Sequence, residues 1–295
     1  MKNKLNKYGK VITKPLLKEY TTYKIGGPAK YIVYPRNIEN LKELIIYLKK
    51  EKIKYKIIGK GSNLIFDDKG YNGIIIKLDE FDHLKINRNI VTVGSGYNMM
   101  RLANKLSRSG LSGLEFASGI PGSVGGCTFM NAGAYNSDMG YVVKSVTVLD
   151  NDLNIKNLTN KEMNFHYRTS FLKENPSYIC LEVVFKLRLG NKEEMMEIIK
   201  DRKERRLLSQ PLEYPSAGSV FRNPVNNYAG KLIEEIGYKG KKYGEIEVSL
   251  KHANFIINKG LGTSKDLINL INDIQSKVKE NYDIDLLLEQ EIVKY

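Results

Sequence analysis

The chain contains no tryptophan, only two cysteines and only three histidines among its 295 residues. Cys127 and Cys180 lack the Cys-x-x-Cys spacing, and His83, His166 and His252 lie far apart and outside any metal-ligand motif. This scarcity argues against a zinc site or another catalytic metal, so we assign no metal-binding residues. A structural disulfide is likewise not expected in a reducing compartment.

Long hydrophobic runs are also missing, and no apolar stretch is long enough to cross a bilayer. Residues 1–10 are basic but lack the apolar segment of a secretory signal peptide. The hydrophobic content of 42% and the charged content of 27% are those of a globular protein. We therefore expect a cytoplasmic protein that does not insert into a membrane. We also expect it to be a monomer.

Acidic residues are the minority charge, because 47 Lys and Arg face 33 Asp and Glu, a net charge of +14. Such a balance attracts nucleic acids, membrane surfaces or phosphorylated small molecules. The lysines are spread along the chain, and no RNA-binding signature or helix-turn-helix pattern is present. We favour a lysine-rich surface with no nucleic-acid partner, and keep a basic nucleic-acid-binding module as the non-enzymatic alternative.

Glycine, in contrast, is concentrated in two places. The first glycine loop (residues 59–63) has the sequence Gly-Lys-Gly-Ser-Asn, and the second glycine loop (residues 118–126) has the sequence Ser-Gly-Ile-Pro-Gly-Ser-Val-Gly-Gly. Glycine lets a backbone approach a ligand closely, and N–H groups in such turns bind anions. Neither loop matches the dinucleotide fingerprint, and the chain has no P-loop and no G-x-S-x-G motif. The two loops together predict a large phosphorylated cofactor.

Hydrophobic periodicity predicts α/β elements up to about residue 190 and an α+β portion after it. Helices are expected from residue 37, with Leu41, Leu44, Ile45 and Leu48 on one face, and from residue 99, with Met99, Leu102, Ala103 and Leu106 on one face. A charged helix is expected over residues 192–209. A capping box at residues 263–266 predicts another helix, with Leu267, Leu270, Ile271, Ile274 and Val278 on one face. Strands are expected at residues 55–58, 73–78, 90–93, 142–149 and 180–189, and a last strand at 286–293. The predicted division is an N-terminal segment (1–19), a first domain (20–190) and a second domain (191–295).

Several motifs resemble one bacterial family in their order along the chain. They are Thr-Tyr-Lys-Ile-Gly-Gly-Pro-Ala at residues 22–29, the segments at residues 59–64 and 110–126 that contain the two glycine loops, and the segments at residues 131–135, 167–171, 218–224, 229–233 and 251–255. The family is that of the UDP-N-acetylenolpyruvoylglucosamine reductases, also called UDP-N-acetylmuramate dehydrogenases. Arg168 and Ser219 are 219 − 168 = 51 residues apart, which resembles the shorter form of the family, without an insertion that covers the substrate.

The resemblance implies an α+β chain in which residues 20–190 form a vanillyl-alcohol-oxidase/PCMH-type FAD-binding fold of two α+β subdomains. Residues 191–295 would form a C-terminal α+β substrate-binding domain. It also implies bound FAD, NADPH as co-substrate, and reduction of UDP-N-acetylglucosamine enolpyruvate to UDP-N-acetylmuramate for peptidoglycan synthesis. Another FAD-dependent oxidoreductase of the same fold is the enzymatic alternative.

The same resemblance assigns the catalytic residues. Hydride addition at C3 of the enolpyruvyl group leaves negative charge on C2, so the reaction needs a proton donor and a partner for the carboxylate. Ser219 takes the place of the proton donor, and the planar guanidinium of Arg168 suits the carboxylate. The third residue is an acid near the C-terminus. Spacing favours Glu289, and Glu291 stays open.

The remaining expected contacts follow from the motifs. The expected FAD-binding residues are Gly59, Lys60, Gly61, Ser62, Asn63, Ser118, Gly119, Ile120, Pro121, Gly122, Ser123, Gly125 and Gly126. The expected substrate-binding residues are Tyr167, Arg222, Asn223 and Lys231.

Overall fold

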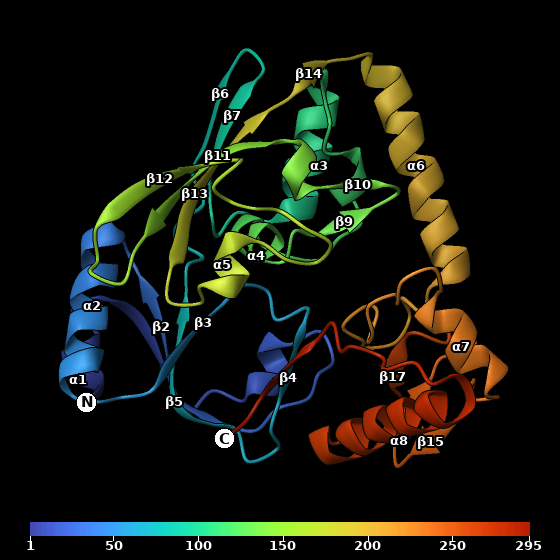
Figure 1. Ribbon diagram of the computed structural model, residues 1–295. Helices are drawn as coiled ribbons and strands as arrows, with labels where there is room; N and C mark the ends of the chain where they lie inside the picture. The colour runs from blue at the N-terminus through green and yellow to red at the C-terminus, as the bar shows by residue number, and fades with distance from the viewer. The chain divides into compact units, whose positions relative to one another are not determined.

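A computed structural model describes all residues from 1 to 295, and the chain forms two compact units that alternate along the sequence (Figure 1). Unit 1 consists of Met1–Ile12, Ile32–Lys60 and Ile75–Glu204, and unit 2 consists of Thr13–Tyr31, Gly61–Ile74 and Arg205–Tyr295. The domains predicted from the sequence, with boundaries at residues 19 and 190, are continuous segments, whereas each unit combines three separate segments. The assignment of cofactor binding to one predicted domain and substrate binding to the other stays a prediction.

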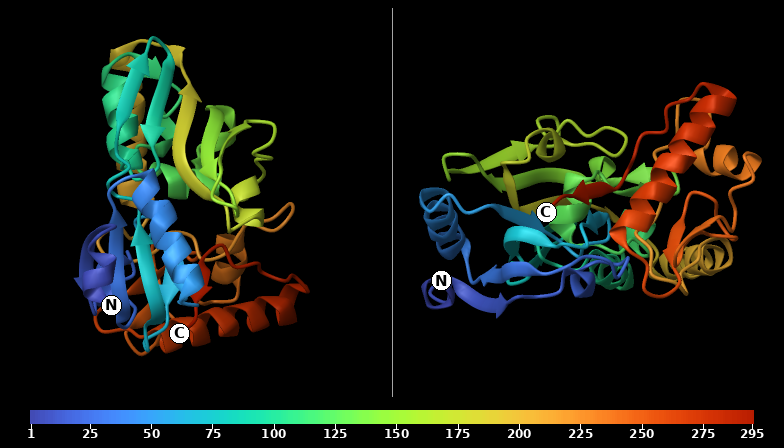
Figure 2. Two further views of the ribbon diagram at one scale, coloured as in Figure 1. Left: turned by 90° about the vertical axis from the view of Figure 1, so that its left-hand side faces the viewer. Right: turned by 90° about the horizontal axis from the view of Figure 1, so that it is seen from below.

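Unit 1 contains a five-stranded antiparallel sheet with the order β12-β11-β13-β7-β6. Figure 2 shows the hairpin of β6 and β7 beside β13. The strands are β6 (Leu84–Asn87), β7 (Ile90–Gly94), β11 (Val143–Leu149), β12 (Ile155–Thr159) and β13 (Ile179–Lys186). Alternate residues such as Val91 and Val93 are buried, as expected for strands with one face on a core.

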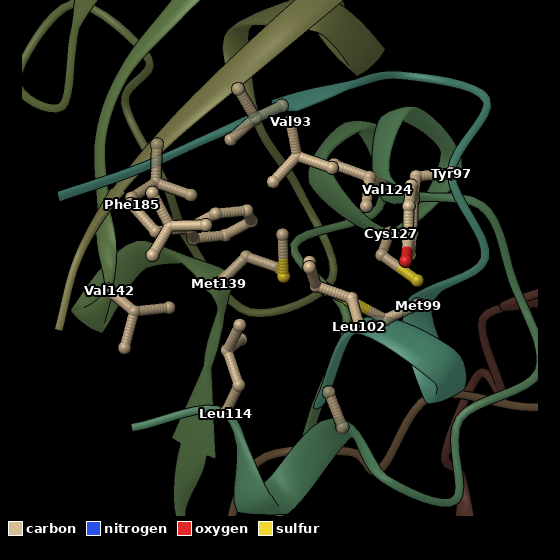
Figure 3. Packing of buried hydrophobic residues seen from close by; sticks show 14 of the residues in the cluster. Val93, Tyr97, Met99, Leu102, Leu114, Val124, Cys127, Met139, Val142 and Phe185 are labelled. Atoms are coloured by element: carbon tan, nitrogen blue, oxygen red, sulfur yellow. The ribbon is translucent and has the colours of Figure 1, made fainter. Parts of the chain in front are cut away.

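Helix α3 (Met99–Arg108) contributes one side of this core. Its apolar residues fall on one face, as the sequence predicts, and Leu102 packs in a cluster with Met139, Val142 and Phe185 (Figure 3). Gly110 follows the helix with φ +75°, a conformation that glycine adopts without steric cost. The short helices α4 (Val124–Phe129) and α5 (Phe171–Glu174) complete this region.

A four-stranded sheet has the order β1-β2-β5-β3. Its strands are β1 (Gly9–Thr13), β2 (Ala29–Pro35), β3 (Tyr55–Ile58) and β5 (Tyr71–Lys77). Further elements before residue 210 include α1 (Lys2–Leu5), α2 (Ile38–Lys50), β8 (Leu111–Ser112), β9 (Gly133–Ala134), β10 (Ser137–Asp138), β14 (Arg188–Leu189) and α6 (Lys192–Ser209). The predicted bounds of α6 are confirmed, and the four residues predicted to form the apolar face of α2 are all buried.

Unit 2 is built around helix α8 (Ser264–Tyr282) and the antiparallel sheet β15-β16-β17. The strands are β15 (Lys242–Tyr243), β16 (Ile246–Val248) and β17 (Ile256–Asn258), and helix α7 (Ala229–Glu235) precedes them. The predicted start of the helix is confirmed, because Thr263 is the N-cap and its hydroxyl accepts a hydrogen bond from the Asp266 N–H. The Asp266 carboxylate accepts a hydrogen bond from the Thr263 hydroxyl. The apolar face predicted for this helix is buried. None of the helices combines the length with the apolar character that a membrane-spanning segment needs.

The last predicted strand is wrong in its extent. Strand β18 covers only Glu291–Val293 and pairs in parallel with β4 (Leu64–Phe66). The residues before it pair with a different segment, through the bridge between Phe221 and Leu288. The chain therefore changes its pairing partner at Gln290, and this change determines what surrounds the two candidate glutamates.

Candidate functional site

The two glycine loops touch within unit 1. A Cβ atom added to Gly59 would lie 2.5 Å from the Ser123 Oγ and 3.9 Å from the Gly126 Cα. The sequence predicts that the loops act together, and the structure brings Gly59 against the second loop. Glycine at position 59 therefore lets the two loops pack directly against each other, which brings both expected FAD-binding segments to one place.

The second glycine loop is fixed by hydrogen bonds to the chain just before α3. Ser123 is the N-cap of α4, and its hydroxyl accepts a bond from the Gly126 N–H. The Val124 N–H donates to the Tyr97 carbonyl, and the Gly125 N–H donates to the Ser95 carbonyl. The first N–H groups of α4 are thus engaged within the protein. These N–H groups are therefore not available to an anion, so we expect an anion to bind the earlier residues of the loop and not the start of α4.

A charged cluster of Lys60, Lys77 and Asp79, of which the sequence predicted only Lys60, supports the first glycine loop. The Lys77 ammonium donates to the Gly59 carbonyl over 2.6 Å and lies 3.4 Å from an Asp79 carboxylate oxygen. Lys60 lies 3.4 Å from the other oxygen of Asp79. Burial lowers the pKa of Lys77, although the charge of Asp79 opposes this shift. Two ammonium groups share one carboxylate, so the cluster favours an anion near Gly59.

Arg168 lies at the tip of a tight hairpin whose ends, His166 and Thr169, exchange both backbone hydrogen bonds. Its φ of +56° is uncommon for a residue with a side chain. Its Nη2 donates to the Gly133 carbonyl over 3.0 Å, and its guanidinium lies 5.3 Å from the centre of the Tyr167 ring. This geometry holds the guanidinium beside the segment at residues 131–135.

A buried asparagine, Asn131, joins that segment to the hairpin. Its Nδ2 donates to the His166 carbonyl over 2.8 Å, and its Oδ1 accepts from the Gly140 N–H over 3.0 Å. Its φ of +43° is a conformation that asparagine adopts more readily than most residues. The motif at residues 131–135 was the only sequence signal for this residue, and it did not reveal the supporting role.

Ser219 lies in unit 2, in a segment that pairs on both sides. On one side Ser219 forms a bridge with Phe255, and the Val220 N–H donates to the Asn254 carbonyl. On the other side the Glu289 N–H donates to the Val220 carbonyl over 2.8 Å. The side chain of Asn254 adds two hydrogen bonds to the backbone of the next residue along, Phe221. Two of the three predicted catalytic positions, those of Ser219 and Glu289, are thus neighbours across paired segments.

The end of the first glycine loop contacts the same glutamates. Asn63 donates from Nδ2 to the Glu289 carbonyl over 3.1 Å, and its own carbonyl accepts from the Glu291 N–H over 2.9 Å. Glu289 is partly buried, whereas Glu291 is exposed on β18. The surroundings favour Glu289, the residue that spacing also favours.

The predicted substrate-binding residues have unequal surroundings. The Nε of Arg222 is buried without a hydrogen-bond partner, which makes it a ready donor to a ligand. The Oδ1 of Asn223 is engaged by the Ala229 N–H over 3.1 Å at the start of α7. Lys231 and Tyr167 are exposed. None of these contacts assigns a substrate, and all four residues stay predictions.

Comparison with known proteins agrees with this arrangement. Residues 29–159 match the model of an FAD binding domain, and residues 210–293 match the model of the UDP-N-acetylenolpyruvoylglucosamine reductase C-terminal domain. The UDP-N-acetylenolpyruvoylglucosamine reductase of Bacillus licheniformis is 46% identical over 97% of this chain and 94% of its own length. That of Bacillus subtilis is 44% identical with the same coverage.

A solved structure extends the comparison to the fold. The crystal structure of UDP-N-acetylenolpyruvylglucosamine reductase from Thermus caldophilus superimposes with a TM-score of 0.81 at 34% identity. The match covers 96% of this chain and 98% of that one. The predicted combination of an FAD-binding α+β fold and a C-terminal α+β domain is confirmed. The chain belongs to the UDP-N-acetylenolpyruvoylglucosamine reductase family.

Proposed function

We propose that this protein reduces UDP-N-acetylglucosamine enolpyruvate to UDP-N-acetylmuramate, a step in the synthesis of peptidoglycan precursors. When bound, FAD would supply the hydride-transfer chemistry between NADPH and C3 of the enolpyruvyl group, and the two glycine loops are the segments expected to hold it. The observation that carries the proposal is the pairing of the Ser219 segment with the Glu289 segment, which Asn63 joins to the first glycine loop. The reaction itself is inferred from membership of the family, and the geometry indicates which residues would take part in it.

Ser219 is the group that we expect to protonate C2. A hydroxyl is a weak acid in water. Hydride addition at C3, however, leaves negative charge on C2, and C2 becomes basic enough to take a proton from a hydroxyl. The two flanking segments fix the backbone of Ser219, so its hydroxyl starts from a defined position. We assign the role of the third catalytic residue, the acid near the C-terminus, to Glu289. Its partly buried carboxyl group would influence the charge that develops on the serine oxygen.

Arg168 is expected to bind the substrate carboxylate. Its fork of N–H donors can form two parallel hydrogen bonds to a carboxylate, and its charge offsets the negative charge that spreads onto that group. The contact with Gly133 orients the guanidinium before substrate arrives. Arg222 is the best supported of the predicted contacts to the UDP-sugar, because its Nε lacks a partner.

We place the enzyme in the cytoplasm because its proposed reactants, NADPH and a nucleotide-linked sugar, are cytoplasmic metabolites.

The proton-donor role predicts a selective defect in Ser219→Ala. The variant should bind FAD and be reduced by NADPH at a rate within about twofold of the wild type, because no proton is delivered to the substrate in that step. Reoxidation by the enolpyruvyl sugar should slow by about 10²- to 10⁴-fold, the usual contribution of a general acid. Stopped-flow absorbance of the flavin measures both steps.

Ser216→Ala is the matched control, since Ser216 lies three residues away on the same segment and no role is assigned to it. It should leave both steps unchanged. Near-normal reoxidation in Ser219→Ala would remove Ser219 from the donor role. A wild-type protein that binds no FAD would contradict the proposed reaction as a whole and the alternative flavin oxidoreductase with it.

A further inference from the structure

A buried glutamine, Gln290, contacts the turn that carries Ser219. Its side chain is 3% exposed, and its Nε2 lies 3.1 Å from the Ala217 carbonyl oxygen and 3.3 Å from those of Gly218 and Ser219. Gly218 has φ +73°, so the turn uses a backbone conformation that few other residues adopt. One side-chain amide therefore donates to the carbonyl groups of a glycine turn that ends at the proposed proton donor.

Tyr23 determines which way this amide points. Its hydroxyl donates to the Gln290 Oε1 over 3.1 Å, and its side chain is completely buried. Burial raises the pKa of Tyr23, so the hydroxyl keeps its proton and remains a donor. A phenol that donates requires the amide oxygen to face it, which leaves the amide N–H groups for the turn. The Tyr23 carbonyl in turn accepts from the Asn258 Nδ2 over 3.0 Å, which anchors the tyrosine.

The same glutamine follows Glu289 directly in the chain. The Glu289 N–H donates to the Val220 carbonyl, one residue beyond Ser219. The Ser219 segment is thus attached to residues 289 and 290 at two adjacent points, one through the backbone and one through a side chain. A shift of the glutamine would change the position of the serine relative to the neighbouring acid.

We propose that Gln290, oriented by Tyr23, is a positioning residue that holds the Ser219 hydroxyl in line for proton transfer to the substrate. The proposal rests on the proposed donor role of Ser219 and adds to it a buried amide that is hydrogen-bonded to Tyr23 and to the turn at residues 217–219. It differs from a purely structural role, because it predicts a defect confined to the step in which the proton moves.

Two variants test this role. Gln290→Leu keeps a side chain of similar volume but removes the donor to the turn, and Tyr23→Phe removes only the hydroxyl that orients the amide. The matched control is Gln275→Leu, since Gln275 is a partly buried glutamine whose Nε2 donates to the Leu286 carbonyl over 2.8 Å, away from the turn. All three are compared with the wild type in the FAD-loaded state by stopped-flow.

We expect reduction by NADPH to stay within about twofold of the wild type in every variant, because that step delivers no proton to the substrate. Reoxidation by the enolpyruvyl sugar should slow by about 10- to 100-fold in Gln290→Leu, since small misplacements of a reacting group have effects of this size. Tyr23→Phe should slow it less. The solvent deuterium isotope effect on reoxidation should rise in both variants, because proton transfer then limits the rate, and should not change in Gln275→Leu.

The outcomes separate this inference from the proposed function. If Ser219→Ala is slow but Gln290→Leu and Tyr23→Phe reoxidise normally, the positioning role is wrong and the donor role survives. If Ser219→Ala reoxidises normally, both are wrong. Equal losses in both steps of Gln290→Leu would indicate general structural damage and would also contradict the proposal. Should Gln290→Leu fail to fold, Tyr23→Phe decides the question by the same rates and the same isotope effect.

Discussion

Glu289 and Glu291 are two positions apart in the chain but have different neighbours. Glu289 precedes the change of pairing partner at Gln290, and its N–H is bonded to Val220. Glu291 follows the change and lies exposed on β18, where it pairs with Leu64. A carboxyl group acts on a reaction only when it lies near the reacting atoms. The surroundings therefore favour Glu289 over Glu291 for the proposed catalytic role.

Separate Glu289→Gln and Glu291→Gln variants test that assignment. The amide keeps the shape of the side chain but removes its charge and its ability to exchange a proton. We expect Glu289→Gln to slow flavin reoxidation by at least about 10²-fold, in the range of general acid–base effects, while Glu291→Gln stays within about twofold of the wild type. Single-turnover stopped-flow with the enolpyruvyl sugar measures this. A reversed order of the two effects would move the role to Glu291.

Sequence motifs indicate the residues with proposed chemical roles, but they do not indicate the residues that support them. Arg168 and Ser219 were found because each stands in a recognisable motif. Lys77 was missed because it is the last residue of an apolar strand, where a lysine indicates only that the strand ends. Its hydrogen bond to the Gly59 carbonyl joins residues that are 18 positions apart. Gln290 was missed because its partner Tyr23 is 267 residues away. Support of this kind depends on tertiary contacts that no local pattern records.

At the scale of elements, helices with clear periodicity and caps were predicted well. The bounds of α6 and the apolar faces of α2 and α8 agree with the structure. The last strand was predicted too long, because a run of apolar residues cannot show that its two halves pair with different partners. Helix signals are local, within one or two turns, whereas strand pairing joins segments that are distant in sequence.

The N-terminus of α8 gives a prediction at this scale. Asp68 accepts hydrogen bonds from the Ser264 N–H over 2.8 Å and from the Lys265 N–H over 3.2 Å, and its own N–H donates to the Ser264 hydroxyl. A carboxylate here satisfies free helix donors and interacts favourably with the helix dipole. Asp68→Ala should therefore lower the free energy of unfolding by about 1 kcal/mol, measured by urea denaturation followed by circular dichroism.

Asp152→Ala is the control, because Asp152 is also exposed and lies in the turn after β11, away from any helix terminus. It should change the free energy of unfolding by no more than about 0.5 kcal/mol. Added salt should reduce the difference between Asp68→Ala and the wild type, since the dipole contribution is screened. Equal effects of the two alanine variants would show that Asp68 does not cap α8.

At the scale of the whole molecule, the net charge of +14 corresponds to the anionic character of every proposed reactant. FAD and NADPH carry phosphates, and the UDP-sugar carries a diphosphate and a carboxylate. The charge is spread over the chain, and the cluster of Lys60, Lys77 and Asp79 places an excess positive charge beside Gly59. A field of this sign raises the rate at which anions reach the protein without requiring any specific contact.

This field predicts that turnover depends on salt through substrate capture. Raising the ionic strength from about 10 mM to about 0.1 M shortens the Debye length from about 30 Å to about 10 Å. We expect kcat/KM for NADPH to fall by roughly tenfold over this range, with kcat nearly constant because bound reactants are screened less. NADH, which lacks the 2′-phosphate, is the matched probe and should show a shallower dependence. Parallel slopes for the two nucleotides, or no slope, would mean that the positive charge serves solubility rather than capture, because capture by a field must scale with the charge of what is captured.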